Sequence, residues 1–356
     1  MKRLALLFLF WSVLVPSAHA ALFCVSNSTE LAQALLSASV TDASDEIRLR
    51  TGNYPAPPGG FVYQNFDHPE ALVTISGGWS FFFGNPCGVR SDLSAFSTKL
   101  SGNNQDRVMR IRPFSSTNVI VEGLTFQQGN TLGLGLDQGQ GAGLRVETFV
   151  GWTGDVQIRG NAFLNNTAFD YGGGLAASAG GRLVVNNNLF LTNSACRHGA
   201  ASLTYSGNDT GYLINNTVAY NFIRSGCQIG TSAGGLRIGG ISPVLIVNNV
   251  LWGNEEFDLV NDSGGLMIRN DFQHLLGPAT GGPNYNLSPQ FTGNGFFPFR
   301  LSADSPLIDL GLVPSSGLPW QLLSYDLDGD PRVIGSSVDL GAFELSDLIF
   351  EDGFDG

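Results

Sequence analysis

The chain has 356 residues, of which 30 are acidic and 18 are basic, so its formal net charge is −12. This charge argues against nucleic-acid binding, which needs clustered basic side chains, and Lys99 is the single lysine after residue 20. No stretch after residue 20 approaches the roughly 20 apolar residues of a membrane-spanning helix. We therefore expect no transmembrane span in the mature chain.

The first 20 residues have the pattern of a secretory signal peptide. Lys2 and Arg3 precede an apolar run over residues 4–15, and Ala18 and Ala20 supply the small residues of a cleavage site before Ala21. Cleavage leaves 16 basic residues against 30 acidic ones, a net charge near −14. The pattern predicts an exported protein.

Residues 21–105 are expected to cover the start of the fold and to form its first, irregular coils. Asn27 and Glu30 have the spacing of a capping box, and four apolar residues follow on one helical face: Leu31, Ala34, Leu35 and Ala38. Short strand-like runs come next at residues 47–49, 72–75 and 109–111. The sequence therefore predicts a short helix that caps the first coil.

Four aromatic residues lie close together in this region: Trp79, Phe81, Phe82 and Phe83. Aromatic rings can form a platform for sugar rings. Because neighbouring residues of a strand point to opposite faces, about half of these rings are expected in the core.

Residues 106–280 carry four copies of one pattern, with a hydrophobic residue at −3, Asn at 0, a hydrophobic residue at +2 and Asn at +5. The copies are Ile158, Asn161, Phe163, Asn166; Val185, Asn188, Phe190, Asn193; Leu213, Asn216, Val218, Asn221; and Ile246, Asn249, Leu251, Asn254. Weaker copies flank them, and a second strand-like run precedes each clean copy, at residues 143–146, 174–177, 201–203 and 235–238. Such a repeat, without helical periodicity, predicts an all-β parallel solenoid.

The fixed positions of the Asn residues predict two ladders along the solenoid. Stacked amides can donate to the coil on one side and accept from the coil on the other. Asn also tolerates the left-handed backbone of a sharp corner. A chain that was merely rich in Asn would scatter these residues instead of keeping them in register.

Four cysteines in an exported chain are consistent with two disulfides. Cys196 and Cys227 fall near the same corner of adjacent coils, so we expect them to pair. Cys24 and Cys87 would then fasten the N-terminal segment. A metal site is the alternative, but the close Cys or His spacing of such a site is missing.

Enzymes that cut acidic polysaccharides need clustered carboxylates, either with Ca²⁺ and an Arg or Lys base or as a hydrolytic pair. The clean copies have no Asp or Glu from −2 to +5, and the outward positions Arg145, Ala176 and Arg237 have no carboxylate nearby in sequence. The remaining catalytic candidates are Arg197, His198 and Arg237. Seven loop carboxylates are interpreted as solvated turn residues: Asp155, Asp170, Asp209, Glu255, Glu256, Asp258 and Asp262.

Residues 281–346 are expected to form a C-terminal coil and cap, followed by an acidic, aromatic tail at 347–356. Asp326, Asp328 and Asp330 have the alternating spacing of a Ca²⁺ loop. Ser337 occupies the place of the bidentate Glu of such a loop, so a tight acidic turn is the favoured interpretation and calcium the weaker one.

Several blocks of the chain are similar to a known family: residues 49–54, the block from Gly77 to Cys87, the coils, and the closing runs 305–309 and 338–344. They resemble the secreted right-handed parallel β-helix proteins of bacteria, which are related in fold to pectate lyases and are often labelled choice-of-anchor Q domain proteins. The tail resembles C-terminal signatures of exported proteins of some gamma-proteobacteria. The resemblance implies a β-helix that is secreted or displayed on the surface of a Gram-negative bacterium.

Two functional hypotheses follow. The first is a non-catalytic β-helix that acts in adhesion, or in contact with carbohydrate or matrix. The second is a polysaccharide lyase or glycoside hydrolase that uses loop carboxylates. The sequence names neither the ligand nor the oligomeric state.

Overall fold

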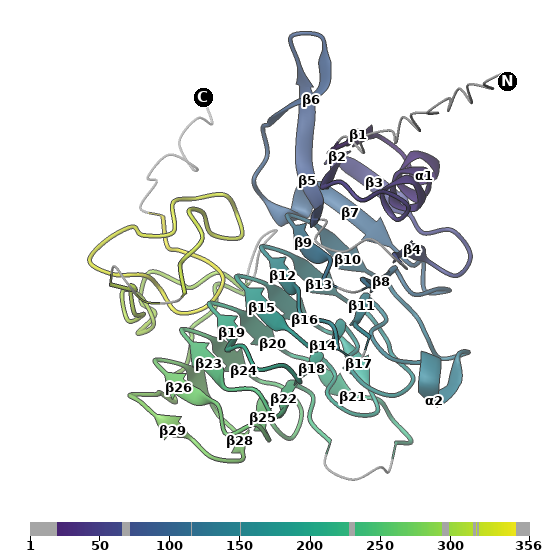
Figure 1. Cartoon of the computed structure of the whole chain (residues 1–356). Helices are drawn as coiled ribbons and strands as arrows, with labels where there is room; N and C mark the ends of the chain where they lie inside the picture. Colours follow the sequence, from purple (N-terminus) through teal and green to yellow (C-terminus); the bar gives the residue numbers. More distant parts are fainter. Residues whose placement is uncertain are drawn as a thin grey trace, which may run out of the picture.

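The computed structural model describes residues 20–65, 72–114, 116–149, 151–227, 232–293, 299–315, 318 and 320–346. The acidic tail and, except for Ala20, the segment expected to be a signal peptide lie outside the described residues. The chain winds into stacked coils whose strands form three long sheets, which we call sheets A, B and C (Figure 1). Neighbouring strands along each stack are parallel, which confirms the all-β solenoid expected from the repeats.

Sheet A contains, in spatial order, β1 (Leu22–Val25), β2 (Asp45–Arg50), β5 (Leu72–Phe82), β9 (Asn118–Glu122), β12 (Asp155–Arg159), β15 (Arg182–Asn186), β19 (Gly211–Ile214), β23 (Val244–Val247), β26 (Leu266–Ile268) and β29 (Thr280–Gly281). In addition, β6 (Asn85–Arg90) pairs antiparallel with β5.

Sheet B contains β3 (Gly52–Pro55), β7 (Thr98–Ser101), β10 (Thr125–Gln127), β13 (Ala162–Leu164), β16 (Leu189–Leu191), β20 (Thr217–Ala219), β24 (Val250–Trp252) and β27 (Asp271–Phe272). Sheet C contains β4 (Phe61–Gln64), β8 (Met109–Arg112), β11 (Leu144–Glu147), β14 (Leu175–Ala179), β18 (Ala201–Tyr205), β22 (Leu236–Gly240), β25 (Leu259–Asn261) and β28 (Leu275–Leu276).

Short elements complete the described residues. The strand β17 (Ser194–Ala195) pairs with β21 (Phe222–Ile223), and the helical segments are α1 (Ser28–Ala38), α2 (Gly135–Gln138) and the 3-10 turn η1 (Ala95–Ser97). No helix in these ranges is long and apolar enough to cross a membrane.

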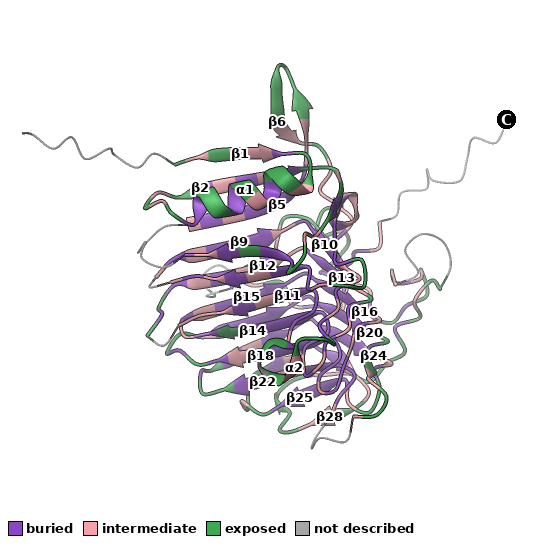
Figure 2. Cartoon of the chain, turned by 90° about the vertical axis from the view of Figure 1, so that its right-hand side faces the viewer, coloured by how far each residue is buried: buried purple, intermediate pink, exposed green. Residues whose placement is uncertain are grey.

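Each coil of the central region takes one strand from sheet C, then one from sheet A and one from sheet B. Equivalent residues therefore stack, and the side chains between the sheets are mainly apolar. The buried parts of the strands are purple in Figure 2. The rings of Phe126, Phe163 and Phe190 form one such stack, with centroids 5.1 Å and 4.7 Å apart. Burial of these side chains between the sheets supplies the main stabilisation of the solenoid.

The predicted N-terminal helix is confirmed as α1, whose buried residues are the four predicted ones. Its N-cap is Asn27, whose Oδ1 accepts a hydrogen bond from the Glu30 amide at 3.0 Å. The Glu30 carboxylate accepts from the amide of Ser26, at 2.7 Å, where a full capping box would use the amide of Asn27. The second hydrogen bond of the capping box therefore forms one residue earlier in the chain than expected.

Both Asn ladders are present and buried. In the first, each Nδ2 donates to the next Oδ1, from Asn161 through Asn188 and Asn216 to Asn249, over distances of 2.9–3.1 Å. This ladder continues beyond the clean repeats to Asn270 and Asn284. The second joins four asparagines in the same way and ends on the carboxylate of Asp258: Asn166, Asn193, Asn221 and Asn254.

One part of the ladder argument was wrong. The ladder asparagines are not the residues with left-handed backbone. That conformation belongs to the residue before each of them, including Asn187, Asn215 and Asn248, with φ of 57°, 51° and 59°. The corner thus uses two adjacent residues, one for the turn and one for the ladder.

The two expected disulfides are formed, Cys24 with Cys87 and Cys196 with Cys227. The first joins the β1 strand to β6, and the second joins loops of adjacent coils near β17 and β21.

The segment after the last coil does not stay at the end of the solenoid but runs back along its side (Figure 1). The left-handed corner residues hold it. Asn215 Nδ2 donates to the carbonyls of Asp339 and Gly341, and Asn248 exchanges two hydrogen bonds with Leu312. The segment reaches the η1 turn, where the Ala95 amide donates to the Leu327 carbonyl. This C-terminal segment covers part of sheets A and B and leaves the outer face of sheet C open.

Candidate functional site

The outer face of sheet C carries a row of polar side chains. Leu144 and Val146 of β11 are buried in the core, so Arg145 and Glu147 point outward. The strand register places Arg110 of β8 beside Arg145 on one side. On the other side the row continues through three residues of the following strands, Ala176, Ser202 and Arg237.

Three arginines surround Glu147. Arg112 Nε lies 2.6 Å from Glu147 Oε1, Arg145 Nη2 lies 2.5 Å from Oε2, and Arg110 also pairs with Oε1. Burial raises the pKa of Glu147, but the hydrogen bond from Arg110 and the charges of the three arginines outweigh it and hold that pKa below its usual range. Glu147 is therefore ionised, and the four side chains together carry about two excess positive charges.

These residues line a groove of about 620 Å³. Its remaining lining consists mainly of short or uncharged polar side chains: Gln138, Gln140, Tyr171, Ala176, Ser178, Ser202 and Thr204. The arginines thus stand at one end of a floor made of small residues. Such a site offers guanidinium groups to an anion and hydroxyl and amide groups to neutral polar atoms.

A buried arginine supports the wall of this groove. Arg107 Nε donates to the Gly141 carbonyl at 3.1 Å, and its Nη2 donates to the carbonyls of Gln140 and Gln138. Burial lowers the pKa of Arg107 to about 10, with help from the charges of Arg145 and Arg110. At neutral pH the side chain is charged and fastens the loop after α2 beside the arginine cluster.

The three weak catalytic candidates lie at the end of this face but do not form a catalytic group. Arg197 pairs with Asp170 Oδ1, with Nε at 3.0 Å, and Arg237 Nε lies 2.6 Å from Asp262 Oδ2. Burial lowers the pKa of His198 to about 3, assisted by the charges of Arg237 and Arg197. Its Nδ1 has no hydrogen-bond partner among the described residues. A neutral imidazole without a carboxylate partner is poorly placed for general acid or base catalysis.

The interpretation of the loop carboxylates as solvated was wrong for two of them. Asp170 and Asp258 are buried, and Asp258 ends the second Asn ladder. The statement that no carboxylate lies near Arg145 was also wrong, since Glu147 follows it by two residues and pairs with it. Within the described lining of the groove, Glu147 is the one carboxylate, so it lacks the second that hydrolysis of a glycosidic bond uses.

The acidic turn at residues 326–330 is organised by hydrogen bonds. Asp326 Oδ1 accepts from the amides of Asp328, Gly329 and Asp330 at 2.9 Å, and Oδ2 accepts from the Glu344 amide. Asp328 pairs with Arg300. The three carboxylates do not converge, and no group of three or more His, Cys, Asp or Glu residues in the described ranges has a metal-binding arrangement. The three amide hydrogen bonds to Asp326 Oδ1 close residues 326–330 into a tight turn.

A second groove, of about 800 Å³, lies between the outer face of sheet A and the C-terminal segment. Its charged groups pair with one another: Arg90 and Arg159 both bind Glu122, at 2.7 Å and 2.6 Å, and Arg182 binds Asp155. Trp320 of the C-terminal segment packs on Tyr212, Ile214 and Val247 of sheet A. This groove is closer to charge balance than the groove on sheet C.

The aromatic group at Trp79 lies elsewhere. Trp79 is half-buried beneath the guanidinium of Arg48, 3.8 Å from the ring centroid, whereas Phe81, Phe82 and Phe83 are all exposed. The expectation that half of these rings enter the core was wrong for the three phenylalanines, because β5 leaves the solenoid there and continues into a hairpin.

Comparison with known proteins adds little. No family model and no curated protein matches the chain. Among solved structures, the pectate lyase Pel9A is 16% identical with a TM-score of 0.41, over 93% of this chain and 98% of that chain. The Escherichia coli protein YbhC is 13% identical with a TM-score of 0.27, over 69% and 72%. We draw no argument from likenesses this weak, and the parallel β-helix rests on the strand pairing itself.

Proposed function

We propose that the exported protein binds an acidic polysaccharide along the outer face of sheet C and does not cleave it. The observation that carries this proposal is the cluster of Arg110, Arg112 and Arg145 around one carboxylate, on a chain whose net charge is −12. Glu147 holds the arginine cluster in place, and the cluster opens onto a groove. Such a cluster suits carboxylate or sulfate groups, because a guanidinium group can bind them through bidentate hydrogen bonds.

The rest of the groove fits the other part of such a ligand. Ser178 lies on β14, Ser202 and Thr204 lie on the next strand of sheet C, β18, and Gln138 and Gln140 also line the groove. Hydroxyl and amide groups at the spacing of β-strands, about 4.8 Å, can meet the hydroxyl groups of an extended sugar chain. Adhesion or attachment to an extracellular matrix is the function that this binding would serve.

The test is the affinity of the purified protein for polygalacturonate, with neutral dextran as the comparison, measured by calorimetry. We expect Arg110→Gln with Arg145→Gln to weaken binding about tenfold or more, since each arginine contributes a charge-assisted hydrogen bond. Binding should also weaken as salt is added. The matched control is Arg182→Gln, which removes an ion-paired arginine from the outer face of sheet A and should leave the affinity unchanged.

Two results would overturn the proposal. Equal affinity for the neutral and the acidic polymer would mean that the arginines do not recognise the acidic groups. Release of reducing ends or unsaturated sugars from the acidic polymer, with or without Ca²⁺, would favour the second hypothesis, a lyase or hydrolase.

A further inference from the structure

A hairpin projects from the solenoid at its N-terminal end. The last part of β5 leaves the body of sheet A and pairs with β6, and Figure 1 shows the two strands standing clear of the coils. Three consecutive phenylalanines occupy its tip: Phe81, Phe82 and Phe83 are 60%, 49% and 89% exposed. Soluble proteins rarely concentrate exposed aromatic rings without a binding role.

The hairpin carries no charged side chain before its last residue, Arg90, which pairs with Glu122 at the base. From residue 72 to residue 89 the sequence contains no Asp, Glu, Lys, Arg or His. A surface hairpin would ordinarily carry charged residues that protect its edges. Their absence means that the tip can enter an apolar medium without the large cost of removing a charge from water.

The turn at the tip has a residue that the backbone does not favour. Phe83 has φ of 42° and Gly84 has φ of 83°. Two-residue turns with positive φ at both positions are best served by Asn-Gly, and a bulky residue in this conformation is strained. Packing in the core does not explain the phenylalanine, because its ring is the most exposed of the three and contacts the exposed ring of Phe82. Strain of this kind is typical of functional positions.

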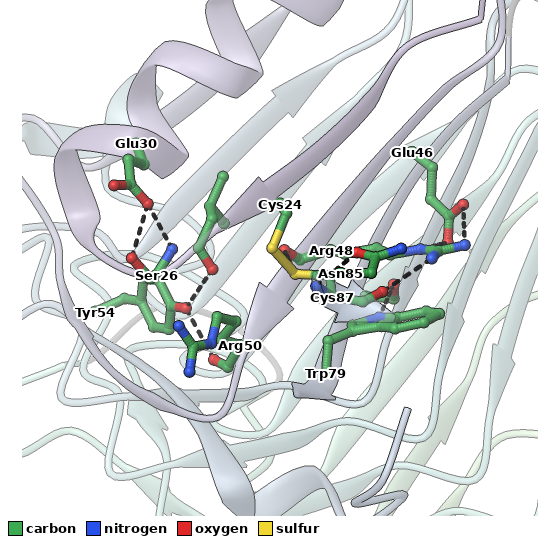
Figure 3. The surroundings of a disulfide bond; sticks show 12 residues. Cys24, Ser26, Glu30, Glu46, Arg48, Arg50, Tyr54, Trp79, Asn85 and Cys87 are labelled. Carbon is green, nitrogen blue, oxygen red and sulfur yellow. Dashed lines mark hydrogen bonds and ion pairs between the residues drawn. A yellow bond between two sulfur atoms is a disulfide. The ribbon is translucent and has the colours of Figure 1, made fainter. Parts of the chain in front are cut away.

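The base of the hairpin is fastened to the fold, as Figure 3 shows. Cys87 of β6 is bonded to Cys24 of β1, and the Arg48 guanidinium stacks on Trp79 and donates to the Cys87 carbonyl at 3.1 Å. Trp79 Nε1 donates to Ser76 Oγ at 2.8 Å. The aromatic tip is therefore presented on an anchored support, not on a loose loop.

We propose that this tip inserts into the interface of a lipid bilayer with electrically neutral headgroups. A convex apolar tip needs no shaped receptor in lipid, and Phe side chains are typical of interfacial segments. Because the chain carries a net charge of −12, neutral headgroups fit better than anionic ones.

The geometry argues against two other occupants. The rings of Phe82 and Phe83 are 4.4 Å apart but lie at 79° to each other, so they form no flat platform for a sugar, and Phe offers no hydrogen bond. A second copy of the chain would need an apolar recess for the tip. The groove on sheet C is mainly polar, and the apolar part of the groove on sheet A, at Ile214, is already packed by Trp320 of the C-terminal segment.

The experiment is flotation of the exported, purified protein with phosphatidylcholine vesicles. We expect the protein to float with the vesicles, and Phe81→Ser with Phe83→Ser to lower the partition coefficient about 30-fold or more, since each buried ring contributes substantially. The matched control is Phe222→Ser, which removes another partly exposed phenylalanine far from the hairpin and should leave flotation unchanged.

A second variant separates binding from folding. Phe83→Asn places the favoured residue in the turn, so we expect an unchanged or higher melting temperature together with weaker flotation. Phe83→Trp should keep flotation. The proposal is overturned if the wild-type protein does not float with pure lipid, which would also be the result for a protein partner, or if Phe83→Asn floats as the wild type does.

Discussion

The outer faces of sheets A and C both carry ion-paired arginines, but they differ in what covers them and in the role that we expect for each. Both present outward arginines, and both form ion pairs between neighbouring coils. On sheet A, the arginines near Glu122 and Asp155 stand close to charge balance, and the C-terminal segment lies over the strands that follow. On sheet C, three arginines share Glu147 and the groove stays open.

This difference shows how one repeated scaffold can separate stability from binding. The covered face buries apolar side chains such as Tyr212 and Val247, whereas the open face keeps unbalanced charge in contact with solvent. Changes on the first face are expected to alter the free energy of unfolding. Changes on the second are expected to alter affinity with little effect on folding.

The largest expected effect is on the covered face. Trp320→Ala would remove the buried ring that joins the C-terminal segment to sheet A, and we expect a loss of about 3–5 kcal/mol in unfolding free energy, by analogy with large-to-small core substitutions. Denaturant unfolding measures this loss. The control is Tyr325→Ala on the same segment, whose side chain is nearly half exposed and should matter much less.

The same variant tests the separation of the two faces. Where Trp320→Ala remains folded, it should bind polygalacturonate with unchanged affinity. A parallel loss of affinity would mean that the C-terminal segment and the groove on sheet C are coupled.

A comparable effect is expected at the corner between sheets A and B. Asn216 accepts hydrogen bonds from the backbone and side chain of Asn188 and donates to Asn249 and Val185. Asn216→Leu leaves these buried partners unpaired, so we expect destabilisation of about 2–4 kcal/mol. Thermal unfolding checks this, with the exposed Asn208→Leu as control. An unchanged melting temperature would count against the ladder as a source of stability.

A smaller effect depends on pH. Asp271 of β27 is buried beside Asp258, and one of its carboxylate oxygens has no partner among the described residues. Burial raises the pKa of Asp271 to about 7. The folded chain therefore keeps a proton that the unfolded chain loses, so stability falls as pH rises from about 4 to about 7.

We expect Asp271 to contribute on the order of 1–3 kcal/mol to this loss, and Asp271→Asn to reduce the pH dependence by that amount. The rest would come from Asp326 and Glu344, because burial raises their pKa values to about 6 and about 8. Unfolding free energies measured at several pH values across this range give the test. Asp271 Oδ1 accepts a hydrogen bond from the Leu287 amide at 2.7 Å, and the side-chain oxygen of the Asn variant can accept the same bond. A slope equal to that of the wild type would assign the pH dependence to other groups.

The coils could be predicted from sequence because each repeats a local rule. Asn161 and Asn188 occupy the same place in their coils, so the register of sheets A and B follows from spacing alone. The pairing of Cys196 with Cys227 was expected because both residues fall near the same corner of adjacent coils, although they do not occupy the same place in the repeat. Because equivalent positions of successive repeats stack, a pattern within one repeat predicts which residues of distant segments lie in contact.

The functional face could not be predicted in this way. Arg110 and Arg112 belong to β8, which precedes the clean repeats, and only the pairing of β8 with β11 brings them to Glu147. The C-terminal segment has no repeat, and its position depends on hydrogen bonds to corner residues such as Asn248 and on the packing of single side chains such as Trp320. The sequence did indicate part of this face. Arg145 and Glu147 are two residues apart on one strand, so both side chains point to the same outer face.

The smallest expected effect on stability, and the most direct test of the open face, is Glu147→Gln. Partly exposed ion pairs contribute little to folding, so we expect less than about 1 kcal/mol of change. The substitution removes the one negative charge among three guanidinium groups, so affinity for polygalacturonate should rise several-fold at low salt and fall more steeply as salt is added. If affinity instead falls at low salt, the carboxylate acts mainly by holding the arginines in place, and geometry outweighs charge in this groove.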